Sequence, residues 1–319
     1  MYRRTLLGML LGAVGMAVAE TQQPKEEWSP QPPEEWIPQS EEEWRQNRFK
    51  VPGTLSLRAR RRVEDPPGSG KFRTSEEVLR WEVAQTAIII CDVWDTDSCV
   101  TEVQRNRILA PRINEAVSAA RNLGVMIFHC PSDTMKYYAR TPQRIRMQRA
   151  PMVPSPIPIG ATPQNPDPLF RGVCGDNISK EFFTGPGPST TRGNGKYPWQ
   201  REHSAIDIAG YDGTSESGQE VYNYCKQEGI TNLAITGVHT NECVLNRSFG
   251  IRMMTRLGFN MVLVRDLSDS GYFPHAPPFI SHTRGSELIV EHIEAHWCPS
   301  ILSDDLTSVI PGTADPSGS

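Results

Sequence analysis

The feature that most constrains the fold is an alternation of short apolar runs with amphipathic segments. Apolar runs typical of buried parallel strands occupy residues 86–91, 125–130, 232–236 and 261–265. Segments with helical periodicity, most of them followed by a glycine, occupy residues 104–122, 215–228, 243–257 and 286–296. This order predicts an α/β fold: a doubly wound three-layer sandwich with a mostly parallel central sheet of the Rossmann type.

A cysteine lies where the third apolar run meets the third helical segment. The connecting sequence is Thr236-Gly237-Val238-His239-Thr240-Asn241-Glu242-Cys243-Val244. Unpaired backbone N–H groups and the positive end of the helix dipole favour a thiolate in the first turn of a helix. The position therefore suits a nucleophile. The alternative is that Cys243 is a small buried residue, as most free cysteines are.

A carboxylate, Asp92, directly follows the first apolar run. Ligands of parallel sheets bind beyond the carboxyl ends of the strands, so we expect Asp92 and Cys243 to face one crevice. The alternative is that Asp92 caps a turn or the next helix. Asp95 and Asp97 follow closely, but such a cluster is more often a solvated loop than a cation site, and we predict no metal and no cofactor.

Two of these segments resemble a known enzyme superfamily. Ile88-Ile89-Ile90-Cys91-Asp92 and the sequence around Cys243 resemble the isochorismatase-like cysteine hydrolases, which include nicotinamidases and N-carbamoyl-amide hydrolases. The resemblance covers roughly residues 85–297. The stretches from Trp199 to Ile206 and from Arg284 to Leu288 resemble an exported, poorly characterised branch.

The resemblance implies a hydrolase, most often of C–N bonds, acting on a small amide, imide, carbamoyl or vinyl-ether-like molecule. Cys243 would be the nucleophile and Asp92 the general acid and base. The family also uses a lysine that stands before a Ser-Ala-Phe-like segment. The corresponding Ser204-Ala205-Ile206 has no lysine at that place. The candidates for the third position are Lys196, Gln200 and Arg201.

The resemblance also implies an oxyanion-binding element that runs from Gly237 through Val238 and His239 to Cys243, with a cis peptide between Gly237 and Val238. We expect the substrate pocket to include Trp94, His129, Trp199, His203 and Asn241. Packing in the core is an equal alternative for Trp199, and a structural role at the strand end is the stronger alternative for His129.

The metal-binding Asp-x-His stretch of nicotinamidase-type relatives is missing after the second apolar run, where the sequence is His129-Cys130-Pro131-Ser132-Asp133. This absence agrees with the expectation of no metal. The missing lysine, in turn, keeps open a rival of another class: a catalytically impaired, small-molecule-binding protein of the same fold.

Residues 1–19 have the pattern of a secretory signal peptide. Arg3-Arg4 precede an apolar run from Leu6 to Val18, and Ala17-Val18-Ala19 is a small-x-small cleavage site. We expect cleavage after Ala19, export to the periplasm or the extracellular space, and no stable membrane span afterwards. A twin-arginine route and an uncleaved anchor are the alternatives. Export would place the seven cysteines in an oxidising compartment.

The remaining sequence divides the chain further. Residues 20–71 are rich in charge and proline, and Glu-Glu-Trp recurs from Glu26, Glu34 and Glu42. This composition predicts a disordered linker, with an interaction segment as the alternative. The hydrolase domain would span residues 72–302, and residues 303–319 would form a disordered tail. The net charge of −4 gives no basic surplus, so we expect no nucleic-acid partner. A small-molecule substrate is what the family resemblance implies. The family resemblance adds a homo-oligomer as an expected assembly.

Overall fold

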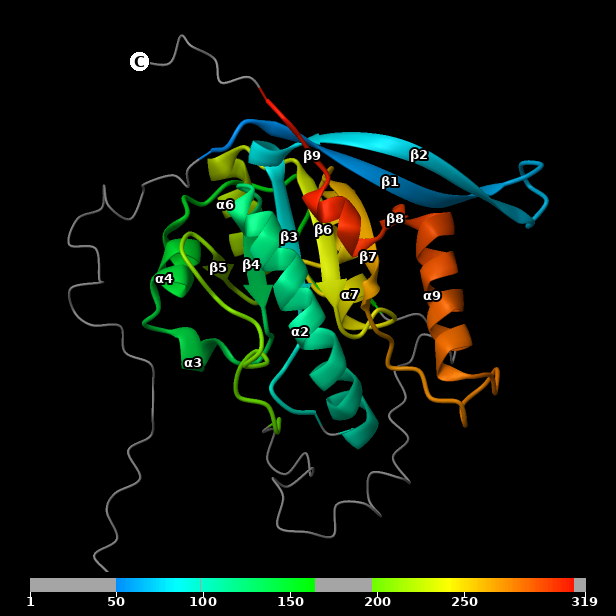
Figure 1. Ribbon diagram of the computed structural model, residues 1–319. Coiled ribbons are helices and arrows are strands. Elements are labelled where there is room, and N and C mark those ends of the chain that lie inside the picture. The colour runs from blue at the N-terminus through cyan, green and yellow to red at the C-terminus, as the bar shows by residue number, and fades with distance from the viewer. Residues whose placement is uncertain (1–49, 98, 164–196, 313–319) are drawn as a thin grey trace, which may run out of the picture.

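The computed structural model describes residues 50–97, 99–163 and 197–312 (Figure 1). The signal segment, the Glu-Glu-Trp repeats, Cys174 and Lys196 lie outside these ranges. Within them, one sheet forms the centre of the molecule. Its parallel strands run in the order β8-β7-β6-β3-β4-β5, with the bounds β3 (Thr86–Cys91), β4 (Met126–Cys130), β5 (Gly213–Thr214), β6 (Asn232–Gly237), β7 (Asn260–Ser268) and β8 (Ser300–Ile301).

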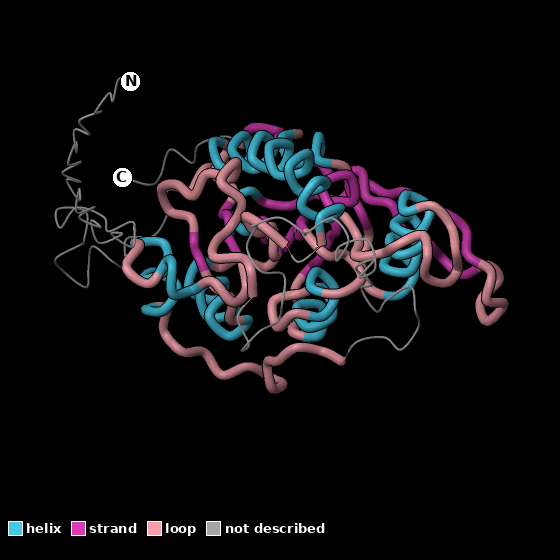
Figure 2. The backbone as a smooth tube through the Cα atoms, turned by 90° about the horizontal axis from the view of Figure 1, so that it is seen from below, coloured by secondary structure: helices cyan, strands magenta, loops and turns pink. Residues whose placement is uncertain are grey.

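Helices cover both faces of this sheet, and Figure 2 shows the strands between two layers of helices. The described helices are α2 (Val100–Asn122), α3 (Met135–Tyr138), α4 (Pro142–Arg149), α6 (Gly218–Glu228), α7 (Cys243–Asn246), α8 (Ile251–Arg256) and α9 (His282–His296), with 3-10 turns η2 (Val83–Gln85) and η4 (Ser303–Thr307). The predicted α/β three-layer fold with a mostly parallel sheet is confirmed.

Side-chain alternation along β3 explains why it lies in the middle of the molecule. Ile88 and Ile90 face one hydrophobic cluster, in which α2 contributes Leu109 and Ile113. Ala87, Ile89 and Cys91 face the other cluster, which α4, α6, α8 and α9 complete. Successive residues of a strand point to opposite faces, so a strand covered on both sides must be apolar throughout. All six residues of β3 are buried.

The structure differs from the expected linker at residues 20–71. Its last part forms strand β1 (Gly53–Glu64), which pairs antiparallel with β2 (Phe72–Glu82) as a long hairpin that extends the sheet beyond β8 (Figure 1). Leu55, Leu57 and Ala59 are fully buried, while the intervening arginines bind acidic groups: Arg58 binds Asp305 and Arg60 binds Glu294, both at 2.8 Å. The segment was expected to be a linker because it is highly charged, although its apolar residues alternate with the period of two that is typical of a strand.

Two further boundaries differ from the expectations. The expected tail from residue 303 begins with η4, and β9 (Val309–Pro311) then pairs with β1. The helix expected over residues 243–257 is two short helices, α7 and α8, separated by residues 247–250. Tertiary packing explains this break, because Phe249 is fully buried in the core and Ser248 accepts a hydrogen bond from the backbone N–H of Gly218 at 2.9 Å.

No helix within the described ranges is long and apolar enough to cross a membrane.

Candidate active site

The site lies where the connections of the sheet change direction. From β3 the chain proceeds outward to β4 and β5, whereas β6 leads to β7 and β8 on the other side. Open α/β sheets bind ligands in the crevice at such a switch point, beyond the carboxyl ends of the strands. Cys91 pairs with Gly237 in the parallel register of β3 and β6. The residues that follow these two strands, including Asp92 and Cys243, are therefore brought side by side.

Close contact between β3 and the loop after β6 depends on Gly237. Its φ is +112°, and a Cβ built on it would lie 2.1 Å from the carbonyl oxygen of Cys91. The next backbone N–H, of Val238, donates to that same oxygen at 2.9 Å. The cis peptide bond joins Val238 to His239, so the expected position between Gly237 and Val238 is wrong by one residue.

Asp92 is completely buried at the end of β3 and makes three side-chain contacts. Its Oδ1 accepts a hydrogen bond from the backbone N–H of Ser132 at 2.7 Å. Its Oδ2 accepts from Nε of Arg247 at 2.8 Å. The Cys243 thiol also hydrogen bonds to this carboxylate. Asp92 therefore stands between a thiol and a guanidinium, as an acid–base group next to a nucleophile would.

Arg247 is a residue of the candidate site that the sequence did not predict. It lies at the C-terminal end of α7, where its guanidinium bridges Asp92 and, at 3.8 Å, the carboxylate of Asp133. Burial alone would lower the pKa of Arg247. Asp92 and the neighbouring thiols outweigh this effect and raise the pKa above its ordinary value. One signal in the sequence could have identified it: Arg247 follows Cys243 by four residues, a spacing that places two side chains on one side of a helix.

Cys243 is the first residue of α7 and is partly exposed. Burial of its sulfur and the negative charge of Asp92 raise the pKa of the Cys243 thiol well above its ordinary value, and Arg247 opposes that rise without cancelling it. The helix has only four residues, so its dipole is weak. These influences favour the protonated thiol beside the carboxylate over the thiolate that a helix start alone would favour.

Some backbone N–H groups beside the thiol have no hydrogen-bond acceptor within the described residues. In the loop from Gly237 to Cys243, the N–H groups of Val238, Thr240 and Glu242 donate to backbone carbonyls. Among the residues that the structure describes, those of His239 and Cys243 have no recorded acceptor. Free N–H groups next to a nucleophile can stabilise an oxyanion as it forms.

The residues proposed for the lysine position do not contact Asp92. The backbone N–H of Gln200 donates to Oδ1 of Asp95 at 3.1 Å. Arg201 donates to the hydroxyl of Tyr137 at 3.2 Å and lies 4.0 Å from Asp95. Lys196 lies outside the described residues. Within those residues, Arg247 is the cation that contacts Asp92.

His129 does not line the pocket. Its imidazole is completely buried between two carboxylates, Glu202 at 2.6 Å from Nδ1 and Asp212 at 3.1 Å from Nε2. Burial would lower the pKa of His129, but the two carboxylates outweigh this effect and raise it to about 9. The structural alternative for His129 thus describes its position better than the pocket hypothesis.

The other expected pocket residues mainly support the loops of the site. Trp94 donates to the carbonyl of Ser132 at 2.9 Å and stacks on Trp199 with ring centroids 4.1 Å apart. His203 is partly buried, which lowers its pKa, and its Nδ1 accepts from the N–H of Ala205. Asn241 is buried and accepts from the backbone N–H of Gly271 at 2.9 Å.

The sequence matches a model of the isochorismatase domain over residues 86–275, which is more than half of the chain. The chain belongs to the isochorismatase family. The matched segment contains Asp92, Cys243 and Arg247, and its fold is that of an isochorismatase-family hydrolase.

Solved structures of the family resemble this chain at low sequence identity. A cysteine hydrolase from Pseudomonas syringae pv. phaseolicola 1448A is 14% identical, with a TM-score of 0.43 over 73% of this chain and 96% of the other. A putative isochorismatase from Burkholderia xenovorans LB400 is 15% identical, with a TM-score of 0.39 over 70% and 86%. A pyrazinamidase of Pyrococcus horikoshii in complex with zinc is 14% identical, with a TM-score of 0.38 over 68% and 99%. No curated protein matches the chain significantly.

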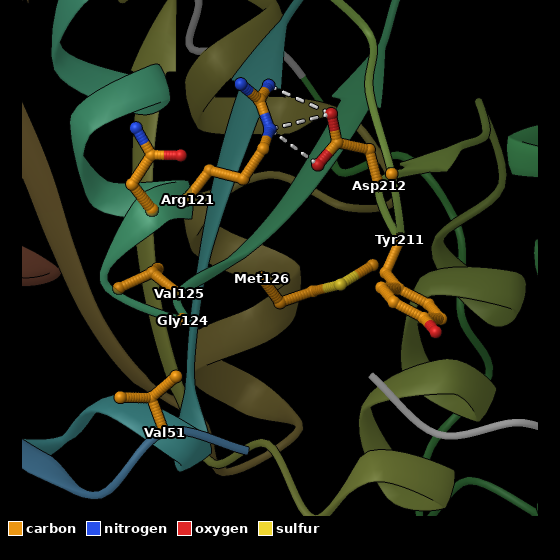
Figure 3. A pocket seen from close by; sticks show the side chains of 9 residues that line it. Val51, Arg121, Gly124, Val125, Met126, Tyr211 and Asp212 are labelled. Carbon is orange, nitrogen blue, oxygen red and sulfur yellow. Dashed lines mark hydrogen bonds and ion pairs between the residues drawn. The ribbon is translucent and has the colours of Figure 1, made fainter. Parts of the chain in front are cut away.

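A cavity of about 280 Å³ lies near the amino end of β4, away from this isochorismatase-family site at the carboxyl ends of β3 and β6. Its lining includes Gly124 and Val125, which precede β4, and Asp212, which precedes β5 (Figure 3). An ion pair between Arg121 and Asp212, at 2.9 Å, forms part of its wall. The cavity thus lies beside the amino end of β4, whereas Asp92 and Cys243 follow the carboxyl ends of β3 and β6.

Replacing Arg247 with methionine should raise the pKa of the Cys243 thiol further, because this guanidinium lowers it in the native site. Alkylation by iodoacetamide, followed at Cys243 by peptide mass spectrometry across pH, should become slower at each pH and shift to higher pH. The matched control is Arg201→Met, which removes the cation that contacts Asp95 instead. A shift in the control and none in the Arg247 variant would contradict this account.

Proposed function

We propose that this chain is a cysteine hydrolase of a small amide, carbamoyl or imide compound, with Cys243 as the nucleophile and Asp92 as the acid and base. The observation that carries the proposal is the contact of one buried carboxylate with both the Cys243 thiol and the Arg247 guanidinium. A binding protein without chemistry has no need of a buried acid–base group held against a thiol.

In the proposed reaction, the sulfur of Cys243 attacks the carbonyl carbon while Asp92 takes the thiol proton. The carbonyl oxygen becomes an oxyanion, which the N–H groups of His239 and Cys243 stabilise. Asp92 then gives its proton to the departing nitrogen, and a thioester to Cys243 remains. Asp92 next takes a proton from water, whose oxygen attacks the thioester carbon. The carbon–sulfur bond then breaks, the acid is released, and Asp92 returns the proton to the sulfur of Cys243.

Arg247 takes the role that a lysine has in the family. A thiol with a raised pKa is activated when it loses its proton in the same step as it attacks, so the carboxylate must remain close and correctly oriented. The guanidinium fixes one oxygen of Asp92 and the N–H of Ser132 fixes the other. The positive charge of Arg247 also stabilises the sulfur as its negative charge develops.

A substrate screen tests this proposal. The purified chain should release product from at least one member of a panel of small primary amides, N-carbamoyl compounds, cyclic imides and vinyl ethers. Cys243→Ala should abolish the release, whereas Cys298→Ala, which alters a buried free cysteine, should retain it. Turnover that survives in Cys243→Ala would contradict the mechanism. Binding of panel members to the native chain without turnover would favour the impaired binding protein.

We also propose that the chain is exported through its signal segment and cleaved after Ala19. A disulfide at Cys99 supports this, because disulfides persist mainly in oxidising compartments. Mass spectrometry of the mature N-terminus should find Glu20 as the first residue, and an intact Met1 in the cytosolic fraction would contradict export.

A further inference from the structure

Three buried side chains outside the proposed catalytic group converge on one point. They are Asp97, from the loop after β3, Glu102, from the first turn of α2, and His239, from the loop after β6. One ligand atom from each lies within 4.8 Å of the other two. This group of three residues, here called the Asp97 cluster, connects the segments that follow the two central strands.

The imidazole of His239 is directed into this cluster. The residue is only 7% exposed, and within the described residues its Nε2 is buried without a hydrogen-bond partner. That nitrogen lies 3.4 Å from Oε1 of Glu102. Two ligands of a tetrahedral metal ion, each about 2.0–2.1 Å from it, lie roughly 3.3 Å apart. The imidazole and the carboxylate therefore already have the separation of neighbouring metal ligands.

The two buried carboxylates of the cluster also favour a bound cation. Two carboxylates are buried together, and buried charges in proteins are either paired or bound to metal. Within the described residues, the arginine beside the cluster is Arg105, whose guanidinium is 4.0 Å from Glu102 but only 2.6 Å from Asp269. The guanidinium of Arg105 is therefore paired mainly with Asp269 and not with the cluster. A shared hydrogen bond holds Asp97 and Glu102 together, and a metal ion could replace its single proton.

We propose that Asp97, Glu102 and His239 bind one first-row divalent cation such as zinc or manganese. One imidazole with two carboxylates is a donor set that such ions accept. The ion would attach the start of α2 to the loop that carries Cys243, and it would hold His239 in place. The site uses other segments than the Asp-x-His stretch of nicotinamidase-type relatives. The proposal departs from our expectation of no metal, and Asp92 and Asp95, which have other partners, take no part in the site.

The test is metal binding by the full chain. The protein is prepared without a polyhistidine tag, treated with EDTA, and titrated separately with Zn²⁺ and Mn²⁺ in a calorimeter. We expect one saturable equivalent per chain. Asp97→Asn and Glu102→Gln should each weaken binding by at least about tenfold, a loss typical of damaged metal sites. Asp95→Asn, a neighbouring acid outside the cluster, and Cys243→Ala should bind like the native chain.

X-ray absorption of the zinc-loaded native chain gives an answer that does not depend on how the variants fold. The expected spectrum contains nitrogen and oxygen at about 2.0–2.1 Å, including imidazole scattering, and no sulfur at about 2.3 Å. Absence of saturable binding, unchanged affinity in folded Asp97→Asn and Glu102→Gln, or sulfur ligation lost in Cys243→Ala would each overturn the proposal.

Discussion

Asp92→Asn will lower kcat/KM for the substrate that the screen identifies by about 10²- to 10⁴-fold, the usual contribution of a general acid–base group. The asparagine amide cannot take the thiol proton or return it to the leaving nitrogen. The same substitution removes the carboxylate that raises the pKa of the Cys243 thiol, so that pKa should fall. Hydrolysis should therefore decrease while alkylation of Cys243 at a given pH becomes faster.

These opposite changes separate loss of catalysis from loss of structure. A misfolded variant would lose hydrolysis without gaining the shifted alkylation profile, and circular dichroism would show the unfolding. The matched control is Asp95→Asn, which removes a carboxylate three residues away that binds backbone N–H groups of Gln200 and Arg201. A comparable loss of kcat/KM in the control would contradict the role assigned to Asp92.

Gly237→Ala should lower the free energy of unfolding by roughly 2–5 kcal/mol, from backbone strain at a positive φ together with steric overlap in a packed site. The φ of +112° disfavours any L side chain, and the new Cβ would lie 2.1 Å from the Cys91 carbonyl oxygen. Since domains are stable by about 5–15 kcal/mol, this is a large fraction of the total. Urea unfolding followed by circular dichroism measures it.

The control for this substitution is Gly229→Ala. Gly229 ends α6 at a φ of +70°, and a Cβ there would meet no atom within 4 Å. Its loss should be about 1–2 kcal/mol, from backbone conformation alone. Equal losses at the two glycines would show that the approach of Gly237 to Cys91 contributes nothing beyond its φ.

The parts of the fold that could be predicted are those with a strong local signal. The apolar runs at 86–91 and 232–236 are covered on both faces, so their composition alone indicates buried parallel strands. The strand at 53–64 was missed because one of its faces carries arginines, whose charge resembles that of a linker. Those arginines are satisfied by Asp305 and Glu294, which lie more than 200 residues further along the chain.

Part of the candidate site could likewise be predicted from the sequence, and part could not. Asp92 and Cys243 follow adjacent parallel strands, so knowledge of the fold class was enough to place them together. The family resemblance predicts the third group just before Ser204, whereas the structure has Arg247 against Asp92. Arg247 reaches that position at a break between α7 and α8 that the helical pattern over residues 243–257 did not indicate.

By itself, the sequence determined the α/β class, the central strands, and the pairing of a carboxylate with a cysteine at their carboxyl ends. These features depend on local hydrophobicity and on residues adjacent to strand ends. The tertiary structure alone decided which cation contacts Asp92, in which direction the pKa of the Cys243 thiol shifts, and which residues surround His129 and His239. Those outcomes depend on burial and on charges brought together from distant segments, because Coulomb energies and desolvation are set by distances in space that a linear pattern does not contain.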